Sequence, residues 1–393
     1  MRSLRVLAIT LLAALLLAGA FLAGYALRDQ RGHNPAGQSA DFGLYWQVHD
    51  LLASEFIGEI PSARTQLYAA IHGLVSSYND PYTVFVEPAP RELERDDLAG
   101  HFGGIGAYMS RNEAGDVILT VMRDRPAARA GVQDGDVLLA VDDQPITAGM
   151  SLEQVIALVR GEEGTKVKLT LRRADKAEPF DVVLVRERIT IPSVEWRVLD
   201  QANHVGYIRI GLFGELTINE LKTAVNELAG QGTDKLVLDL RGNNGGLLDA
   251  AVDTTSQFLR QGVVLREVKR GGAERFYSVK PFTSAAQDWP IALLVDGGTA
   301  SASEIVAGAL RDHGRAVLIG EKTYGKGSVQ MVHELPDGSS LHVTAARWLT
   351  PNRHQLDKVG LEPDVPVSIS AEDRDAGRDP QLARATAWLL GAH

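Results

Sequence analysis

Residues 299–330 read TASASEIVAGALRDHGRAVLIGEKTYGKGSVQ, and this stretch decides how the core of the chain folds. The apolar run at 291–295 predicts a buried strand, so Ser301 falls where a strand turns into a helix. After that helix, the apolar run at 316–319 predicts a second strand, which leads to Lys326 between two glycines. Because only one helix and one strand separate Ser301 from Lys326, an αβ unit could bring the two side chains into contact.

The chemistry of these side chains suggests a nucleophile and its base. A serine hydroxyl is a poor nucleophile at neutral pH and needs a group that takes its proton. Lysine serves only where burial lowers its pKa from about 10.4 toward roughly 7–8. If the chain from Ser328 onward is a strand, Gln330 shares a face with Lys326, and its neutral side-chain carbonyl could orient the amine. A carboxylate at that position would instead favour the ammonium form.

Other interpretations remain open on local chemistry alone. Ser301 and its neighbours Thr299 and Ser303 are all favourable helix N-caps, so the serine could be a structural cap. Lys326 could be a solvated turn lysine. Residues 320–326 also fit the start of a phosphate-binding loop, but the next residue is a glycine where that loop needs Ser or Thr. Nucleotide binding is therefore disfavoured.

TASASEIVAGAL followed by GEKTYGKGSVQ closely resembles the signature of the carboxyl-terminal processing proteases, also called tail-specific proteases, which are serine peptidases with a Ser-Lys pair. The likeness extends over most of the chain beyond the first 40 residues. It implies that Ser301 is the nucleophile, Lys326 the general base and Gln330 the lysine-orienting residue. It also implies that the backbone amides of Gly246 and Ala302 form the oxyanion hole. Ala302 suits this role physically, because unpaired amides at a helix N-terminus favour negative charge.

Three titratable residues near this site have simpler interpretations. Glu304 is expected to be a favourable first-turn acid of the helix, and Asp239 a strand-end residue that orders Arg241 or the glycine loop. His313 falls at the end of the helix after Ser301, where it complements the helix dipole. No histidine–glutamate cluster has metal-ligand spacing, so neither a metal nor another cofactor is expected.

Length, charge and cysteine content further narrow the class of protein. A length of 393 residues implies two or three domains, and a formal net charge of −10 argues against nucleic acid as a partner. The absence of cysteine excludes a thiol nucleophile, disulfides and thiolate metal sites.

The N-terminus predicts export. Arg2 and Arg5 precede an apolar run at 6–27, which as a helix would be about 33 Å long and could cross a bilayer. We expect a retained signal anchor, with a cleaved signal peptide as the alternative. Either interpretation places the rest of the chain in the periplasm or another extracytoplasmic space, with the anchor in the inner membrane.

Residue composition and expected secondary structure divide the remaining chain into segments. After the signal region we expect five segments: a linker (29–40), a helical region (41–97), a PDZ domain (98–188), an α/β core (189–370) and a tail (371–393). Residues 79–83, Asn-Asp-Pro-Tyr-Thr, match a short loop of the family. The family resemblance also implies that the helical region could support a homo-oligomer.

Short strands and glycine turns in residues 98–188 resemble a PDZ domain. Gly103, Gly104, Ile105 and Gly106 match the loop whose amides receive a peptide's terminal carboxylate. Consecutive glycine amides can form an anion-binding nest, and an adjacent strand edge can pair with an extended peptide. Polypeptides bound by their C-termini are therefore the expected partners.

We thus expect an α/β multidomain protein with an N-terminal membrane helix, a helical segment, a β-rich PDZ domain and a catalytic core of the tail-specific protease type. Its expected activity is endopeptidase cleavage near polypeptide C-termini through a Ser-Lys dyad and an acyl-enzyme, with an activating protein as a further candidate partner. The alternatives are a PDZ-based peptide-binding scaffold with a vestigial hydrolase core, and a hydrolase acting on another acyl substrate.

Overall fold

The computed structural model describes residues 42–392, which form parts of two compact units, Met1–Leu67 and Tyr68–His393. In the first unit, helix α2 (Phe42–Glu55) has no buried residue. Helix α3 (Ala63–Ser76) begins in the first unit and ends in the second. The apolar run at 6–27 and the linker at 29–40 lie outside the described residues. Within the described part, no helix has the length and apolarity that a membrane crossing requires.

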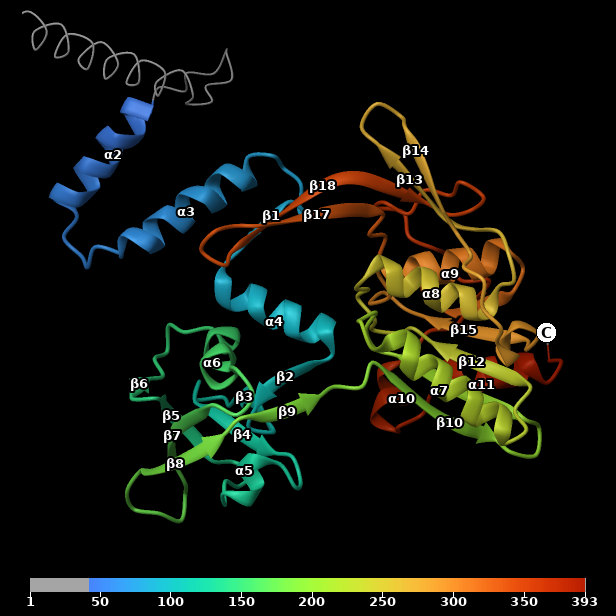
Figure 1. Cartoon of the computed structure of the whole chain (residues 1–393), viewed down its shortest axis with the longest axis horizontal. Coiled ribbons are helices and arrows are strands. Elements are labelled where there is room, and N and C mark those ends of the chain that lie inside the picture. Colours follow the sequence, from blue (N-terminus) through green and yellow to red (C-terminus); the bar gives the residue numbers. More distant parts are fainter. Residues whose placement is uncertain (1–41, 393) are drawn as a thin grey trace, which may run out of the picture. The chain divides into compact units, whose positions relative to one another are not determined.

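The core of the second unit is a six-stranded sheet in the order β10-β11-β12-β15-β16-β19 (Figure 1). Only β10 is antiparallel to its neighbour. Its strands are β10 (Val194–Asp200), β11 (Val205–Ile210), β12 (Lys235–Asp239), β15 (Ile291–Val295), β16 (Ala316–Gly320) and β19 (Val365–Pro366). Every residue of β15 is buried, as expected of a central parallel strand covered on both faces.

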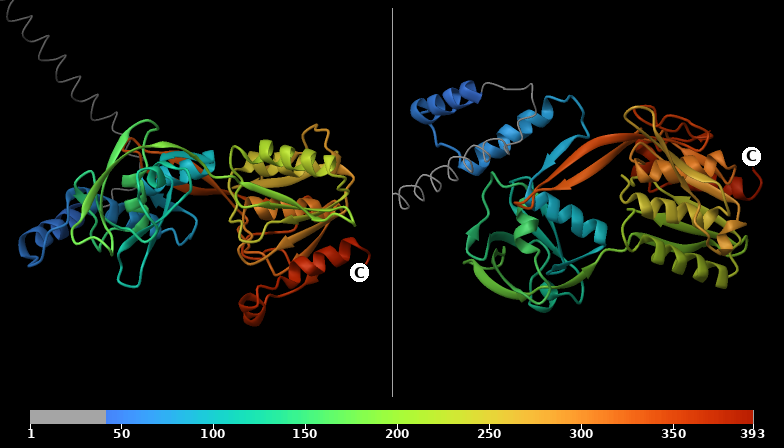
Figure 2. Two further views of the ribbon diagram at one scale, coloured as in Figure 1. Left: turned by 90° about the horizontal axis from the view of Figure 1, so that it is seen from below. Right: turned by 45° about the horizontal axis from the view of Figure 1, so that its top comes forward.

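Helices cover both faces of this sheet. One face packs against α7 (Thr217–Gly230), α8 (Leu248–Phe258) and α9 (Ala302–Asp312). The other face packs against α11 (Pro380–Leu389), seen in red in the left view of Figure 2. The C-terminal tail therefore completes the core instead of standing apart from it.

A second, wholly antiparallel sheet adjoins the core, in the order β1-β18-β13-β14 with β17 added to β18. Its strands are β1 (Val84–Val86), β13 (Val263–Lys269), β14 (Glu274–Ser278), β17 (Ser328–Glu334) and β18 (Ser340–Leu349). Val84 of β1 lies opposite His342 of β18. The chain before the PDZ-like segment is thus hydrogen-bonded into a sheet built mainly from the last third of the sequence.

Between these parts, the chain forms a separate β-rich domain with its own buried core. Helix α4 (Pro88–Ala99) leads into it, β2 (His101–Gly104) enters it, and β9 (Glu187–Thr190) pairs with β2 where the chain leaves. The remaining elements are β3 (Ala107–Arg111), β4 (Val117–Val121), α5 (Pro126–Arg129), β5 (Val137–Val141), β6 (Gln144–Pro145), α6 (Leu152–Val159), β7 (Lys166–Arg172) and β8 (Phe180–Val185). The structure confirms the predicted mixture of a β-rich domain and an α/β core.

Two short elements complete the described chain. The 3-10 helix η1 (Ala285–Gln287) precedes β15, and α10 (Ala371–Asp375) precedes α11. Ser370 caps α10 by accepting a hydrogen bond from the Asp373 backbone N–H at 3.1 Å.

Candidate active site

Ser301 lies at the tight connection between β15 and α9, as the sequence predicts. Its backbone has φ 56° and ψ −116°, a conformation that a residue with a side chain rarely adopts. A helix N-cap usually has an extended backbone, so this geometry is not that of an ordinary cap. Holding a non-glycine residue there costs of order 1–3 kcal/mol, which the surrounding contacts must offset.

The glycine loop after β12 packs directly against this connection. Gly245 and Gly246 have φ values of 112° and 134°. A Cβ on Gly245 would come within 2.8 Å of the Ser301 Cβ, and one on Gly246 within 2.2 Å of the Phe213 carbonyl oxygen. The Asn243 carbonyl accepts the Ala300 backbone N–H at 3.0 Å. Glycine is required here because the loop approaches two other backbones closely.

Two backbone N–H groups beside Ser301 are free to bind a ligand. Among the described residues, neither the Gly246 nor the Ala302 amide donates a hydrogen bond to a protein acceptor. Ala302 is the first residue of α9, where the helix supplies no acceptor for it. Such a pair can stabilise negative charge that develops on an oxygen.

Lys326 precedes β17 and is half-buried. Burial lowers the pKa of its amine, although the charge of Glu94 acts in the opposite direction. Among the described residues, no hydrogen bond or ion pair involves its Nζ; the ring of Tyr82 lies over the amine, with the centroid 5.3 Å away. Burial therefore favours the neutral amine, which is the form that a general base needs.

One cavity of about 800 Å³ brings the candidate residues together. Ser301, Gly246, Lys326 and Gln330 all line it. The remaining wall is largely apolar and includes Leu93, Leu98, Ile156, Leu212, Leu247, Leu248, Val329, Val332 and Trp348. Among the described residues, no hydrogen bond joins Ser301 to Lys326, so the structure places the two on one cavity without pairing them.

Gln330 lines the cavity but forms a hydrogen bond with Ser328 and none with Lys326. Its Nε2 donates to the Ser328 hydroxyl at 2.7 Å, and it forms no hydrogen bond with Lys326. The register of β17 against β18 shifts between Val329 and Gln330, which breaks the strict alternation assumed from the sequence. Its predicted contact with the amine is thus absent from this structure.

Glu304 organises the site, a role that the sequence reasoning missed. Its side chain is completely buried and accepts four hydrogen bonds. The donors are the Thr323 hydroxyl at 2.5 Å and the backbone N–H groups of Gly325 at 2.9 Å, Lys326 at 2.8 Å and Ser301 at 3.0 Å. Burial raises the pKa of this carboxyl, while the four hydrogen bonds lower it. The signal in the sequence for this role was an acidic residue within the largely apolar first part of α9.

Asp239 and Arg241 fix the start of the glycine loop, as predicted. The buried Asp239 accepts hydrogen bonds from Arg241 Nη2 at 2.6 Å and from the Tyr207 hydroxyl at 2.8 Å. Arg241 Nη2 also donates to Asp379 at 2.9 Å, which ties the loop to the start of α11. His313 is at the C-terminal end of α9, where its Nε2 lies 2.9 Å from the Val263 carbonyl oxygen, and it does not line the cavity.

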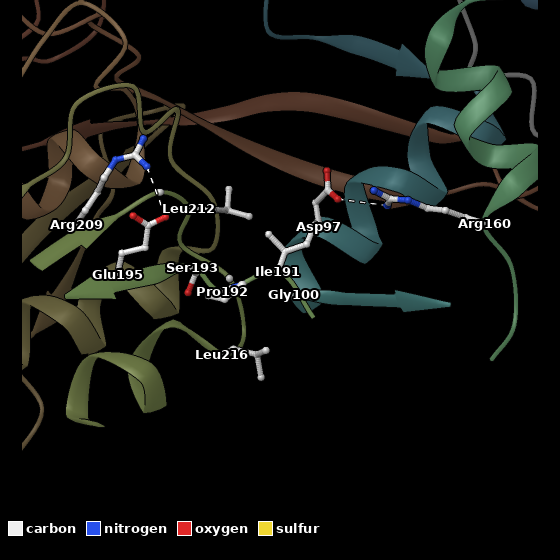
Figure 3. A pocket seen from close by; sticks show the side chains of 12 residues that line it. Asp97, Gly100, Arg160, Ile191, Pro192, Ser193, Glu195, Arg209, Leu212 and Leu216 are labelled. Carbon is white, nitrogen blue, oxygen red and sulfur yellow. Dashed lines mark hydrogen bonds and ion pairs between the residues drawn. The ribbon is translucent and has the colours of Figure 1, made fainter. Parts of the chain in front are cut away.

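A second cavity, of about 460 Å³, flanks the connection that follows β9 (Figure 3). In it, Arg160 points toward Asp97, with the two charged groups 3.3 Å apart, and Arg209 faces Glu195 at 3.9 Å. None of the candidate nucleophile, base or oxyanion residues lines this cavity. Within residues 42–392, no three His, Asp or Glu side chains are grouped so that they could hold a metal ion.

The β-rich domain has a groove of about 160 Å³ beside the predicted carboxylate loop. Gly104, Ile105 and Gly106 line it, and the Ile105 side chain is buried. Gly103 is not among the lining residues. A Cβ on Gly103 would lie 2.1 Å from the Gly161 carbonyl oxygen, so this glycine is explained by packing.

Comparison with known families agrees with this architecture. Residues 204–367 match Peptidase family S41, and residues 114–173 match the PDZ domain. Residues 204–367 thus form a domain of peptidase family S41, and a PDZ domain precedes it in the chain.

Particular relatives share much of the sequence. A "Probable CtpA-like serine protease" of Staphylococcus haemolyticus (strain JCSC1435) is 38% identical over 301 residues, covering 76% of this chain and 60% of the relative. A protein of the same name from Staphylococcus aureus (strain COL) is 37% identical over 321 residues, covering 81% and 63%. The chain thus spans about 60% of the length of these relatives.

Two solved structures are also similar to this chain. The photosystem II D1 C-terminal processing protease is 32% identical, with 84% of this chain and 87% of that chain covered and a TM-score of 0.49. A putative S41 protease from Bacteroides fragilis NCTC 9343 is 16% identical, with 88% and 97% covered and a TM-score of 0.53. At this low identity, the similarity to the Bacteroides fragilis structure shows a shared fold and nothing about activity.

Proposed function

We propose that this protein is a serine endopeptidase that cleaves polypeptides near their C-termini through an acyl-enzyme on Ser301. The observation that carries the proposal is one cavity lined by Ser301, Lys326 and the free amide of Gly246. The neighbouring free amide of Ala302 starts the helix that follows Ser301. These groups supply a nucleophile, a base and two donors for an oxyanion, which acyl transfer requires.

The reaction proceeds in two halves. Lys326 in its neutral form takes the proton of the Ser301 hydroxyl while Oγ attacks the peptide carbonyl, and the Gly246 and Ala302 amides bind the resulting oxyanion. Lys326 then gives the proton to the leaving amine as the carbon–nitrogen bond breaks. A water molecule attacks the acyl-enzyme in the same way, with Lys326 again accepting a proton, and Ser301 is regenerated.

Proton transfer requires Ser301 Oγ and Lys326 Nζ to come into hydrogen-bond contact. Catalytic hydrogen bonds often form only when substrate binds, so the unpaired arrangement is compatible with the role. Gln330 can orient the amine through its side-chain carbonyl oxygen, since only its Nε2 is engaged with Ser328.

A covalent probe tests the proposal directly. We expect a fluorophosphonate to label the protein on Ser301, located by mass spectrometry of the labelled peptide, and to leave Ser301→Ala unlabelled. Ser303→Ala is a matched control, because Ser303 is a buried serine two residues away whose hydroxyl donates to the Asn243 carbonyl. Labelling of another residue, or none in a protein that cleaves peptides, would contradict the assignment. Absence of both labelling and cleavage would favour the peptide-binding scaffold.

The groove beside Gly104, Ile105 and Gly106 supports recognition of the substrate's free C-terminus. Its apolar lining suits an extended peptide with apolar terminal side chains. The test compares a peptide acid with its C-terminal amide on the full protein and on one lacking residues 98–188. Amidation should slow cleavage by the full protein more than by the shortened one, whereas equal rates for acid and amide on the full protein would exclude carboxylate recognition.

We further propose that the enzyme is exported and held in the inner membrane by residues 6–27. The length of this apolar run and the two preceding arginines support that location. Protease protection in spheroplasts tests the side of the membrane, and an N-terminal sequence starting near residue 21 would show cleavage of the segment. A homo-oligomer and an activating protein partner remain part of the proposal, to be tested by light scattering and by copurification.

A further inference from the structure

The Asn-Asp-Pro-Tyr-Thr segment at 79–83 is fixed to the core by its own hydrogen bonds. The carboxylate of Asp80 accepts the Thr83 hydroxyl at 2.6 Å and the Tyr82 backbone N–H at 3.3 Å. Thr83 Oγ1 in turn accepts the backbone N–H of Thr344, on β18, at 3.1 Å. Strand β1 starts at the next residue and pairs with β18. Hydrogen bonds therefore fix this short loop next to the antiparallel sheet that contains β17 and β18.

The loop places the aromatic ring of Tyr82 against Lys326. The ring centroid lies 5.3 Å from Nζ, within the range of a cation–π contact. Burial, a hydrogen bond with Tyr324 and the nearby charges of Asp357 and Glu304 raise the pKa of the Tyr82 hydroxyl to about 12. Tyr324 belongs to the loop that carries Lys326, and its backbone N–H donates to the Thr299 carbonyl at 3.0 Å. Tyr82 thus contacts the loop of the base through its ring.

Other charged groups face the amine without binding it. Glu94 of α4 favours the charged lysine, and His342 of β18, whose own pKa is lowered chiefly by burial, responds to the charge of Lys326. The Glu304 carboxylate is engaged with the backbone N–H of Lys326. Asp357 pairs loosely with Arg347 at 3.8 Å. The ring of Tyr82 therefore lies within contact range of Nζ, whereas these charged groups form no ion pair with it.

A ring over an amine has two opposing effects. Its face attracts the ammonium form, which favours protonation and raises a pKa by about 0.4–1.5, the larger value for a desolvated pair. Its bulk also keeps water away from the amine, and burial lowers a lysine pKa, by up to about 3–5 for a fully buried group. Because the pKa of Lys326 is lowered, with burial as the largest cause, covering should dominate.

We propose that Tyr82 is a positioning residue for the general base, whose ring covers the Lys326 amine, keeps water from it and restricts where Nζ can move. The inference rests on the proposed role of Lys326 and extends it. Tyr82 itself exchanges no proton with the substrate. The aromatic ring excludes water from the amine, so removal of the hydroxyl should leave the pKa of Lys326 unchanged.

The test measures the pH dependence of fluorophosphonate labelling of Ser301, together with kcat/KM for a peptide, in three variants of the full protein. Tyr82→Ala removes the ring, Tyr82→Phe keeps it, and Tyr78→Ala removes an exposed tyrosine four residues earlier, just before the segment. We expect Tyr82→Ala to shift the rising limb upward by about one pH unit, so that its rate is about tenfold lower on the acid side and converges with the wild type in alkali. Tyr82→Phe and Tyr78→Ala should follow the wild-type profile.

A Tyr82→Ala profile that coincides with the wild type, or shifts to lower pH, would overturn the inference. An equal loss at every pH would also overturn it, since that result indicates a merely structural role. If Tyr82→Ala fails to fold at the assay temperature, Tyr82→Leu is judged by the same criteria. A wild-type protein that is neither labelled nor active would instead refute the proposed function, whereas a labelled wild type with an unmoved Tyr82→Ala profile refutes only the role of Tyr82.

Discussion

One carboxylate oxygen of Glu304 accepts the backbone N–H of Lys326 at 2.8 Å. The same oxygen accepts the backbone N–H of Ser301 at 3.0 Å. A single buried group therefore sets the relative position of the segments that carry the candidate nucleophile and the candidate base. Its second oxygen binds Thr323 and Gly325 and fixes the loop before the lysine.

Glu304→Gln should destabilise the protein and reduce its activity. Three of the four partners of Glu304 are backbone N–H groups, which can only donate, so an amide NH2 in place of either oxygen leaves at least one of them unpaired. A buried unpaired donor costs about 1–3 kcal/mol, and we expect a loss of about this size in the free energy of unfolding. Urea denaturation and kcat/KM measure the two effects.

The control for this substitution is Glu362→Gln. Glu362 is exposed and pairs with Lys322 at the surface at 2.7 Å, a contact worth about 0–1 kcal/mol. If Glu304→Gln were as stable and active as Glu362→Gln, the organising role of Glu304 would be wrong.

Gly246→Ala should lower kcat/KM by about 100–1,000-fold, the usual effect of losing one oxyanion donor. The new Cβ would lie 2.2 Å from the Phe213 carbonyl oxygen, and φ of 134° disfavours any side chain, so the loop must move and take its amide away. Gly230→Ala is the control, because a Cβ there meets nothing within 4 Å. Peptide cleavage by folded Gly246→Ala at the wild-type rate would show that this amide is not used.

Arg241→Ala should cost about 3–5 kcal/mol of stability, because it leaves the buried Asp239 without its ionic partner. Arg260→Ala, which breaks an exposed pair with Asp288, should cost about 0–1 kcal/mol. Urea denaturation compares the two variants, and similar midpoints would contradict the structural role of Arg241.

The ion pair between Arg241 and Asp379, at the start of α11, should also weaken in acid. Burial raises the pKa of Asp379, but hydrogen bonds, led by that from Arg241, bring it below the usual value. The stabilisation is therefore complete above the unfolded pKa of about 3.9 and is lost as the pH falls through the lower folded value. The acid loss of stability should be smaller in Asp379→Asn than in the wild type, as thermal unfolding at several pH values can show.

Peptide cleavage should increase with pH through the lowered pKa of Lys326. Only the neutral amine accepts a proton, and burial shifts the neutral form to lower pH than for a free lysine. Lys326→Ala and Lys326→Arg should both be inactive at every pH, since a guanidinium keeps its proton. Lys322→Ala, an exposed lysine near the same loop, serves as control. Near-normal cleavage by Lys326→Ala would disprove the dyad.

The sequence by itself determined the elements around the site. Apolar runs and turn residues were enough to predict β15, α9 and β16 and to put Ser301 at a strand–helix connection, because burial on both faces of a sheet leaves a local signal in the chain. The family resemblance added Gly246, and the structure places it on the same cavity as Ser301 and Lys326.

Only the tertiary structure decided which polar groups meet. Four donors converge on Glu304, the ring of Tyr82 covers Lys326, and Gln330 bonds to Ser328 instead of the lysine. The tail, expected from the sequence only as a segment after the core, supplies Asp379 to Arg241. These partners come from loops and elements far apart in the sequence, or depend on a one-residue shift in strand register. Periodicity reports which face of an element is buried, but the packing of separate segments determines which hydrogen-bond partners reach one another.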